Sequence, residues 1–404
     1  MTTGFAKVLV SHPGRQHSHQ AALALERAGR LAGYWAGVPS RPGQQRGIAG
    51  WMARHAHRYA PVDLPEERAR WLPVAVVLRR LGRTLPIRKE QVIDFLACRA
   101  FDRQVAKQLG RAGARAVLAC EISALDTFRA AKRVGMVTIL DAPSFHYAVQ
   151  DRVTPVAEWL WLHERIVDVK RAEIALADHV ITVSELARAG YVDGGVSDAR
   201  VHAVAVGADT RLFSPGGTGD RELSAPCTFV FAGATIHRKG LDVLLEAFAE
   251  LRRRYPRKAR LVVVGPRSDS HALLERPENR DVEVRPAVPQ AELVELFRRA
   301  DCFVLPSRHD SFGMAVVEAL ACGLPAIVSE MVGAREAVEE GRSGWVVPPA
   351  DSSILARRMA WCVENREALA AMRPAARLAA ERYSWDCYSE RFAQTMARIL
   401  DGAR

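Results

Sequence analysis

The chain has 404 residues, 49% of them hydrophobic and 25% charged, with a formal net charge of +11, and this length predicts two domains of roughly 200 residues each. No segment approaches the roughly 18 continuous apolar residues of a membrane-spanning helix, and the N-terminus lacks a signal-peptide pattern, so we expect a cytoplasmic protein. The seven cysteines are scattered without a C-x-x-C pair, which indicates neither a disulfide framework nor a structural zinc site.

Short apolar segments alternate with helical patterns along the whole chain. In the first half we predict helices over 18–29 and 124–134 and strands over 6–11, 116–120, 136–140 and 179–183. A Gly-, Pro- and Ser-rich linker at 215–226 precedes a second series of strands, predicted over 228–233, 260–265, 282–285, 301–307, 325–329 and 344–348. The alternation predicts two doubly wound α/β domains, 1–208 and 209–384, that face a central cleft at the carboxyl ends of their parallel strands.

The positive charge is concentrated in the first half of the chain. Residues 1–210 carry a net charge of +9 and the remainder +2, and residues 41–115 contain 16 basic and 6 acidic residues together with Trp51 and Trp71. This mixture suits an anionic membrane surface, where each nearby cation contributes about 1 kcal/mol. An arginine-rich solvated surface is an equally good explanation. Nucleic acid is disfavoured as a partner because no recognised binding motif accompanies the charge.

Two carboxylates surround a Phe-Gly turn in the stretch 307–328. Asp310 precedes this turn, and Glu318 lies just over one turn inside a helix that we expect to start near Gly313. The first N–H groups of such a helix lack intrahelical partners and its dipole is positive there, so a diphosphate would be stabilised. Glu318 could then accept hydrogen bonds from two ribose hydroxyls, and Asp310 from the hydroxyls of an attached sugar.

This acid-x7-acid spacing resembles the E-x7-E signature of retaining glycosyltransferases of family 4, whose GT-B fold consists of two Rossmann-like domains. Segments 177–188, 229–251, 260–265 and 301–349 resemble family segments in the same order. The resemblance implies that a C-terminal helix, 385–404, packs back on the first domain, and that neither a metal ion nor another cofactor is needed. It also implies a donor site made of Gly233, Arg238, Lys239, Ala287, Val288, Asp310, Ser311, Phe312, Gly313, Met314 and Glu318.

Two positions depart from the family pattern on the donor side. Ala234 stands where the family has an arginine that clamps the diphosphate; Lys239 matches the second cation, and whether Arg238 replaces the missing one is open. Asp310 stands where glutamate is usual, which shortens the reach to the sugar by about 1.5 Å and would affect donor choice. The nucleobase would be bound by backbone around 282–297, so UDP- and GDP-sugars are not distinguished.

The first predicted strand is followed by Arg15, His17 and His19, which are candidate acceptor contacts. They could equally be polar loop residues. The His-x-His pair lacks a third ligand of suitable spacing, so we expect no metal site. After another predicted strand, Asp141 and His146 resemble residues near the sugar in the family, where either could orient a donor hydroxyl or stabilise charge on the anomeric carbon. With Lys239 and Asp310 they are the candidate catalytic residues, although a solvated loop would also explain them.

The resemblance implies a retaining hexosyl transfer from a UDP- or GDP-sugar to a glycan or lipid-linked acceptor in envelope polysaccharide assembly, at the inner face of the cytoplasmic membrane. Two alternatives stay open. One is a transferase of the same fold that acts on a small soluble acceptor such as a sugar phosphate. The other is a catalytically silent nucleotide-sugar-binding membrane scaffold, which the missing arginine at Ala234 keeps in consideration.

Overall fold

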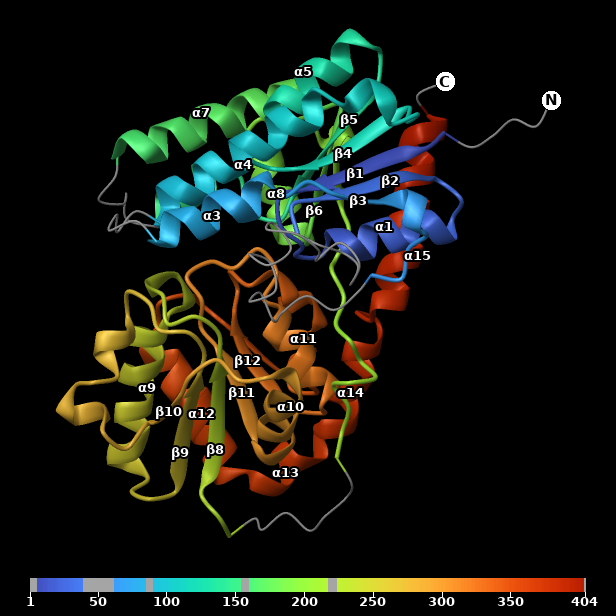
Figure 1. Ribbon diagram of the computed structural model, residues 1–404. Helices are drawn as coiled ribbons and strands as arrows, with labels where there is room; N and C mark the ends of the chain where they lie inside the picture. Colours follow the sequence, from blue (N-terminus) through green and yellow to red (C-terminus); the bar gives the residue numbers. More distant parts are fainter. Residues whose placement is uncertain (1–5, 39–61, 85–89, 154–159, 217–223, 403–404) are drawn as a thin grey trace.

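The computed structural model describes residues 6–38, 62–84, 90–153, 160–216 and 224–402. Two α/β lobes lie one above the other, and the last helix of the chain runs along one side of the first lobe (Figure 1). Each lobe contains one parallel sheet with helices on both faces. The predicted fold class is therefore confirmed.

The first lobe is built on a sheet of seven described strands in the order β3-β2-β1-β4-β5-β6-β7. Successive side chains of a strand point to opposite faces, so Val8 and Val10 of β1 pack against α1 whereas Leu9 joins the core beneath α4 and α5. Its strands are β1 Val8–His12, β2 Leu31–Ala36, β3 Ala69–Trp71, β4 Ala116–Cys120, β5 Val137–Ala142, β6 His179–Thr182 and β7 Val201–Ala203. Its helices are α1 Ser18–Arg27, α3 Val74–Thr84, α4 Glu90–Ala106, α5 Leu125–Arg133, α6 Tyr147–Val153, α7 Leu160–Leu176 and α8 Glu185–Asp193.

The second lobe repeats this plan with six described strands in the order β10-β9-β8-β11-β12-β13. Its strands are β8 Cys227–Ala232, β9 Ala259–Val264, β10 Glu283–Arg285, β11 Cys302–Leu305, β12 Ala326–Ser329 and β13 Gly344–Val347. Its helices are α9 Leu241–Arg254, α10 Gln290–Arg299, α11 Met314–Ala321, α12 Ser352–Glu364, α13 Arg366–Ala371 and α14 Arg373–Glu381. In both sheets the strand order reverses beside the first strand, between β1 and β4 and between β8 and β11. Ligands of such sheets bind at this point, outside the carboxyl ends of the strands.

Three strands of the first lobe, β2, β3 and β7, were not predicted from the sequence. The β2 segment contains Ala and Gly, which have low strand propensity, and β3 and β7 have only three residues each. Pairing with neighbouring strands stabilises these three strands, and this pairing cannot be predicted from the local sequence.

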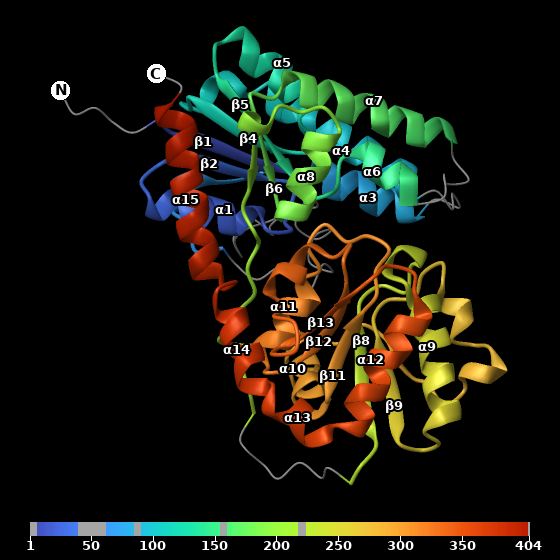
Figure 2. The ribbon, with the colours of Figure 1, turned by 180° about the vertical axis from the view of Figure 1, so that it is seen from behind.

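The chain crosses between the lobes twice, and the two crossings lie side by side. The Ala208 N–H donates to the Tyr383 carbonyl at 2.8 Å. The last helix, α15 (Trp385–Asp401), then runs along the first lobe and packs on α1, as the view from behind also shows (Figure 2). Ion pairs accompany this packing, with Arg30 3.1 Å from Asp401 and Arg27 3.6 Å from Asp386.

Among the described helices, none is both long and apolar enough to cross a bilayer. The basic segment 41–115 is covered only in part, because residues 41–61 and 85–89 lie outside the described ranges. Its predicted affinity for an anionic membrane stays a prediction.

The contact between the two crossings leaves no room for a side chain at Gly207. A Cβ there would lie 2.7 Å from the backbone of Ser384 and Trp385, so we expect Gly207→Ala to lower the free energy of unfolding by about 1–3 kcal/mol, measured by urea denaturation. Gly110 is the matched control, because a Cβ there meets no atom within 4 Å. Equal stability of the two variants would contradict close packing at the crossing.

Candidate active site

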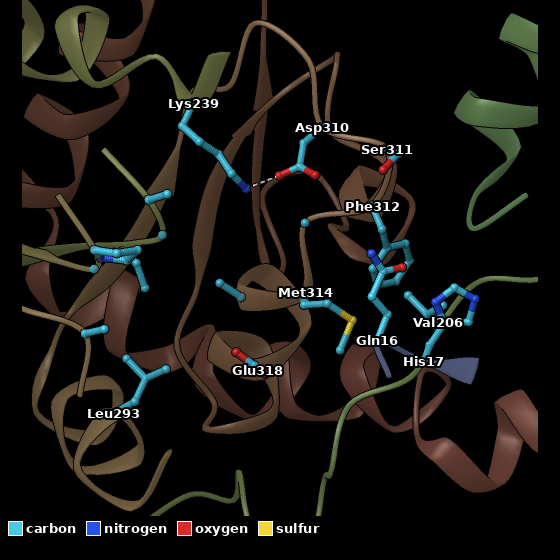
Figure 3. Close-up of a pocket in the computed structure, with 18 of the residues that line it drawn as sticks. Gln16, His17, Val206, Lys239, Leu293, Asp310, Ser311, Phe312, Met314 and Glu318 are labelled. Atoms are coloured by element: carbon cyan, nitrogen blue, oxygen red, sulfur yellow. Dashed lines mark hydrogen bonds and ion pairs between the residues drawn. The ribbon is translucent and has the colours of Figure 1, made fainter. Parts of the chain in front are cut away.

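A cavity of about 680 Å³ lies between the lobes, at the carboxyl ends of both sheets (Figure 3). Its volume is typical of sites for drug-sized ligands. The first lobe and α15 contribute Gln16, His17, Pro143, Val183, Val206 and Trp385. The second lobe contributes Ala232, Gly233, Ala234, Lys239, Val264, Gly265, Pro266, Ala287, Val288, Leu293, Asp310, Ser311, Phe312, Gly313, Met314, Ala315 and Glu318.

Lys239 ends a short 3₁₀ turn that precedes α9. The next residue, Gly240, has φ +71° and leaves space for the Pro306 carbonyl, which a Cβ would approach to 2.1 Å. Glycine is therefore required where the chain turns into the helix. The Lys239 ammonium group forms an ion pair with the Asp310 carboxylate (Figure 3). The two side chains are only 15% and 10% exposed. Lys239, predicted to contact the diphosphate, and Asp310, predicted to contact the sugar, therefore hold each other in place at the cavity.

Asp310 is ionised despite its burial. Burial by itself would raise the pKa of its carboxyl group, but the charges of Lys239 and Arg238 outweigh this effect and the pKa lies below its ordinary value. Arg238 is 3.8 Å from the carboxylate and donates to the His309 carbonyl at 3.0 Å. Asp310 thus has a basic environment before any ligand binds.

Arg238 lies next to the cavity, on the side of Asp310. Ala234 itself lines the cavity, and Arg238 is not among the described lining residues. Its guanidinium group connects the loop before α9 to the loop after β11. Arg308 strengthens this connection through two hydrogen bonds to Asp242, at 2.6 and 2.7 Å. In this structure Arg238 supports the loops of Lys239 and Asp310, and its predicted contact with the donor stays a prediction.

The start of α11 opens onto the cavity. Gly313 precedes it with φ +90°, and a Cβ there would lie 2.8 Å from Val332. Gly313, Met314 and Ala315 all line the cavity, so the first N–H groups of the helix are close to whatever occupies it.

The first lobe contains a helix in the equivalent position, α5, whose start is closed by the protein's own carboxylates. Glu173 accepts from the Ala124 and Leu125 N–H groups at 2.8 and 3.1 Å. Asp102 accepts from those of Asp126 and Thr127, both at 2.8 Å. Of these two equivalent helix starts, α11 is the one that faces the cavity.

Glu318 lies on the cavity side of α11, just over one turn from its start. Among the described residues, no group donates a hydrogen bond to its carboxylate or forms an ion pair with it. Burial raises the pKa of this carboxyl group to about 7. An acidic group that lines a cavity with no partner in the protein is a candidate ligand contact.

Ser311 connects the loop after β11 to the first lobe. Its hydroxyl donates to the Pro143 carbonyl at 2.6 Å, and its own carbonyl accepts from the Ser184 hydroxyl at 2.6 Å. These contacts place β5, β6 and the loop after β11 around one end of the cavity.

On the opposite wall, His17 of the first lobe lines the cavity and pairs with Asp141. The His17 Nε2 lies 3.0 Å from Asp141 Oδ1. Burial opposes charge on His17, but the Asp141 carboxylate raises the pKa of the imidazole above its ordinary value. Burial likewise opposes charge on Asp141, and His17 lowers its pKa. The pair joins one predicted acceptor residue to one predicted catalytic residue, and Asp141 reaches the cavity only through His17.

Three other predicted residues are not among the described lining residues. The His146 ring packs against Tyr191 at a centroid distance of 5.3 Å, and burial together with Lys170 lowers its pKa. His19 packs against Trp385, and burial together with Arg15 lowers its pKa to about 3. Arg15 is partly buried beside it. The structure therefore does not bring His146, His19 or Arg15 into contact with the cavity.

Sequence reasoning missed several of the lining residues, among them Gln16 and Trp385. Gln16 lies between the predicted Arg15 and His17. Trp385 lies at the start of the predicted C-terminal helix, but only the path of α15 between the lobes brings it to the cavity. No local pattern indicates that path.

The raised pKa of Glu318 has a consequence for stability. A carboxyl group with a pKa of about 7 in the folded protein and an ordinary value near 4.5 when unfolded destabilises the fold as the pH rises from about 4.5 to 7. We expect Glu318→Gln to raise the free energy of unfolding at pH 8 by about 3 kcal/mol and to leave it unchanged at pH 4. Urea denaturation at both values measures this difference. If the variant were less stable than the wild type at pH 8, the raised pKa of Glu318 would be contradicted.

Two facing Rossmann-like lobes with a cavity at the strand ends are the arrangement of the GT-B fold. Residues 222–379 match the family model described as glycosyl transferases group 1. The match covers most of the second lobe.

The relatives are bacterial glycosyltransferases. D-inositol 3-phosphate glycosyltransferase 1 of Catenulispora acidiphila is 31% identical over 230 residues, which are 52% of this chain and 54% of that relative. D-inositol 3-phosphate glycosyltransferase of Thermobispora bispora is 29% identical over 283 residues, 66% of this chain and 64% of that relative. The chain thus matches between about half and just under two thirds of the length of these relatives.

Solved structures match the whole described fold. Sucrose-phosphate synthase from Thermosynechococcus elongatus gives a TM-score of 0.74 at 20% identity, over 99% of this chain and all of that one. HepE of Anabaena in complex with UDP-glucose gives 0.64 at 17% identity, over 97% and 99% of the two chains. At these levels of sequence identity, the two matches show a shared fold.

Proposed function

We propose that this protein transfers a hexose from a nucleoside diphosphate sugar to a small soluble acceptor such as a sugar phosphate or a phosphorylated polyol. One observation carries the proposal: Lys239, the start of α11 and Glu318 converge on a single cavity. Together they provide a cation, helix N–H groups and a carboxylate without a partner among the described residues, which complement a diphosphate and a ribose.

We place the donor in the orientation that these contacts favour. The diphosphate lies at the start of α11 beside Lys239, and the ribose hydroxyls donate to Glu318. The base lies against Ala287 and Val288, and the hexose faces Asp310. HepE, a neighbour in fold, was solved with UDP-glucose, which supports a uridine donor. Asp310 must then exchange part of its ion pair with Lys239 for hydrogen bonds from sugar hydroxyls.

In the reaction, the bond between the anomeric carbon and the diphosphate oxygen breaks while the acceptor oxygen bonds to that carbon. The departing diphosphate takes the acceptor proton, and Lys239 and the helix dipole stabilise its developing charge. Buried Asp310 fixes the sugar and stabilises an oxocarbenium-like transition state. Retention of configuration, independence from metal ions and a cytoplasmic location belong to the proposal.

The choice of acceptor rests on the relatives. Their names specify D-inositol 3-phosphate, and the sucrose-phosphate synthase match also points to a small phosphorylated product. They favour the soluble-acceptor alternative over the glycan or lipid-linked acceptor expected first.

Lys239→Ala tests the catalytic part of the proposal. Loss of the cation should lower kcat with UDP-glucose and an accepted sugar phosphate by about 10²-fold or more, with a smaller change in uridine affinity. Lys258→Ala is the control, because Lys258 is an exposed lysine at the far end of β9. A wild type that binds UDP-glucose but neither hydrolyses nor transfers it would instead support the silent-binder alternative.

Protonation of Glu318 gives a second test. Ribose hydroxyls stabilise the ionised carboxylate, so binding should lower its pKa from about 7 and release a proton at pH 6. Calorimetry with UDP-glucose, in two buffers of different ionisation enthalpy, measures this release, because the phosphodiester groups of the ligand do not titrate in that range. Glu318→Gln should bind more weakly and release no proton. Equal proton release by wild type and variant would place the ribose elsewhere.

A further inference from the structure

A second concave region lies at the end of the second lobe that points away from the first lobe (Figure 1). It has a volume of about 710 Å³ and lies where α9 ends and β9 begins, whereas the cavity between the lobes lies at the carboxyl end of β9. We call this region the arginine groove, because five arginines line it: Arg252, Arg253, Arg257, Arg260 and Arg280.

The arginine groove carries positive charge that its own carboxylates do not neutralise. Among the described lining residues only Glu278 and Asp281 are acidic, so five guanidinium groups and two carboxylates give a formal charge of +3. Asp281 is already engaged by Arg252, at 2.8 Å. Arg253 and Arg257 are exposed, and no described carboxylate pairs with either of them. A hollow lined by unneutralised charge of one sign concentrates ions of the opposite sign.

Arg252 holds two walls of the groove together. Its guanidinium group lies 5.3 Å from the centroid of the buried Phe248 ring of α9. The same group donates to the Glu278 carbonyl at 2.7 Å, in addition to its ion pair with Asp281. The end of α9 is thereby tied to the segment before β10, so the shape of the groove does not depend on a ligand.

Arg257 occupies a backbone position that favours glycine. Its φ is +61°, and the turn around it is closed by the Lys258 N–H, which donates to the Tyr255 carbonyl at 3.2 Å. Pro256 is the first central residue of this turn and Arg257 the second. A second central residue with a positive φ is normally glycine or asparagine. Strained non-glycine residues cluster at ligand sites, and here the strained residue presents an exposed guanidinium group to the groove.

The dipole of α9 explains only some of these arginines. Basic side chains in the last turn of a helix offset its negative end, and Arg252 and Arg253 belong to that turn. Arg257, Arg260 and Arg280 lie outside the helix, so its dipole does not account for them. A ligand that is itself an anion accounts for all five.

We propose that the arginine groove is a binding site for a soluble oligophosphate, an anion with two or more linked phosphate groups. Guanidinium groups bind phosphate oxygens through paired N–H donors, and arginines on several segments complement more than one phosphate. The concave shape favours a ligand that enters the groove over a flat membrane surface. This site shares no residue with the cavity between the lobes and goes beyond the proposed function.

Arg257→Gly separates anion binding from a structural role. Glycine relieves the positive φ, so Tm should stay the same or rise. The Kd for tripolyphosphate, measured by titration calorimetry at about 0.1 M salt, should rise about tenfold, because one charge-assisted bidentate contact is lost. A wild type that does not bind tripolyphosphate, or a variant with an unchanged Kd, would overturn the proposal.

Arg253→Ala tests the second lining arginine that has no described carboxylate partner, and we expect a similar rise in Kd. Arg357→Ala is the matched control, because Arg357 is an exposed arginine of α12 in the same lobe and is not among the described lining residues of the groove. Both variants remove one positive charge. If the control weakened binding as much as Arg253→Ala, net charge alone would explain the effect and the site would be refuted.

A last comparison excludes binding elsewhere. The cavity between the lobes also offers a cation to phosphates, so the titrations are repeated in Lys239→Ala with and without Arg257→Gly. Lys239→Ala should keep the tripolyphosphate site, and the double variant should lose it. If Lys239→Ala abolished binding while Arg257→Gly alone kept it, the anion would occupy the cavity and the proposal would fail. It would also fail if the wild type sedimented with anionic phospholipid vesicles through Arg253 and Arg257 but did not bind tripolyphosphate.

Discussion

The ion pair between Lys239 and Asp310 is the interaction on which the proposed donor site depends. It brings the loop after β8 to the loop after β11, and Arg238 and Arg308 fasten the same two loops through neighbouring hydrogen bonds. A buried charge without a partner is costly, so each member keeps the other in place while the site is empty. Since both groups are proposed donor contacts, the ligand replaces an existing interaction and need not organise the loops itself.

The features that sequence could predict are those encoded locally. Buried strands have continuous apolar runs, and the Phe-Gly turn before α11 is readable because Gly313 must adopt a left-handed conformation. The placement of Asp310 and Glu318 beside one cavity follows from that strand, loop and helix unit. The same logic identified Lys239, which precedes the next required turn at Gly240.

What sequence could not predict depends on contacts between distant segments. His146 follows a strand as a site residue would, yet its ring turns toward Tyr191 of α8 and away from the cavity. Arg238 is adjacent to Lys239, but its guanidinium points to the backbone at His309. Trp385 and Gln16 reach the cavity because α15 crosses to the first lobe and because one loop residue adopts a positive φ. The amphipathic pattern of 385–401 does not indicate where that helix packs, and the polar residues around Gln16 do not indicate its positive φ.

The adjacent crossings at Gly207 and Ser384 also determine how the two substrates can meet. Trp385 follows the second crossing directly, and α15 packs on α1, so Trp385, Gln16 and His17 form one mechanical unit with the first lobe. Lys239, Asp310 and Glu318 form another with the second lobe. A swivel about the crossings would alter the distance between these units without dismantling either. Under the proposed function, movement of the lobes would bring the two substrates together without changing the contacts that hold each one.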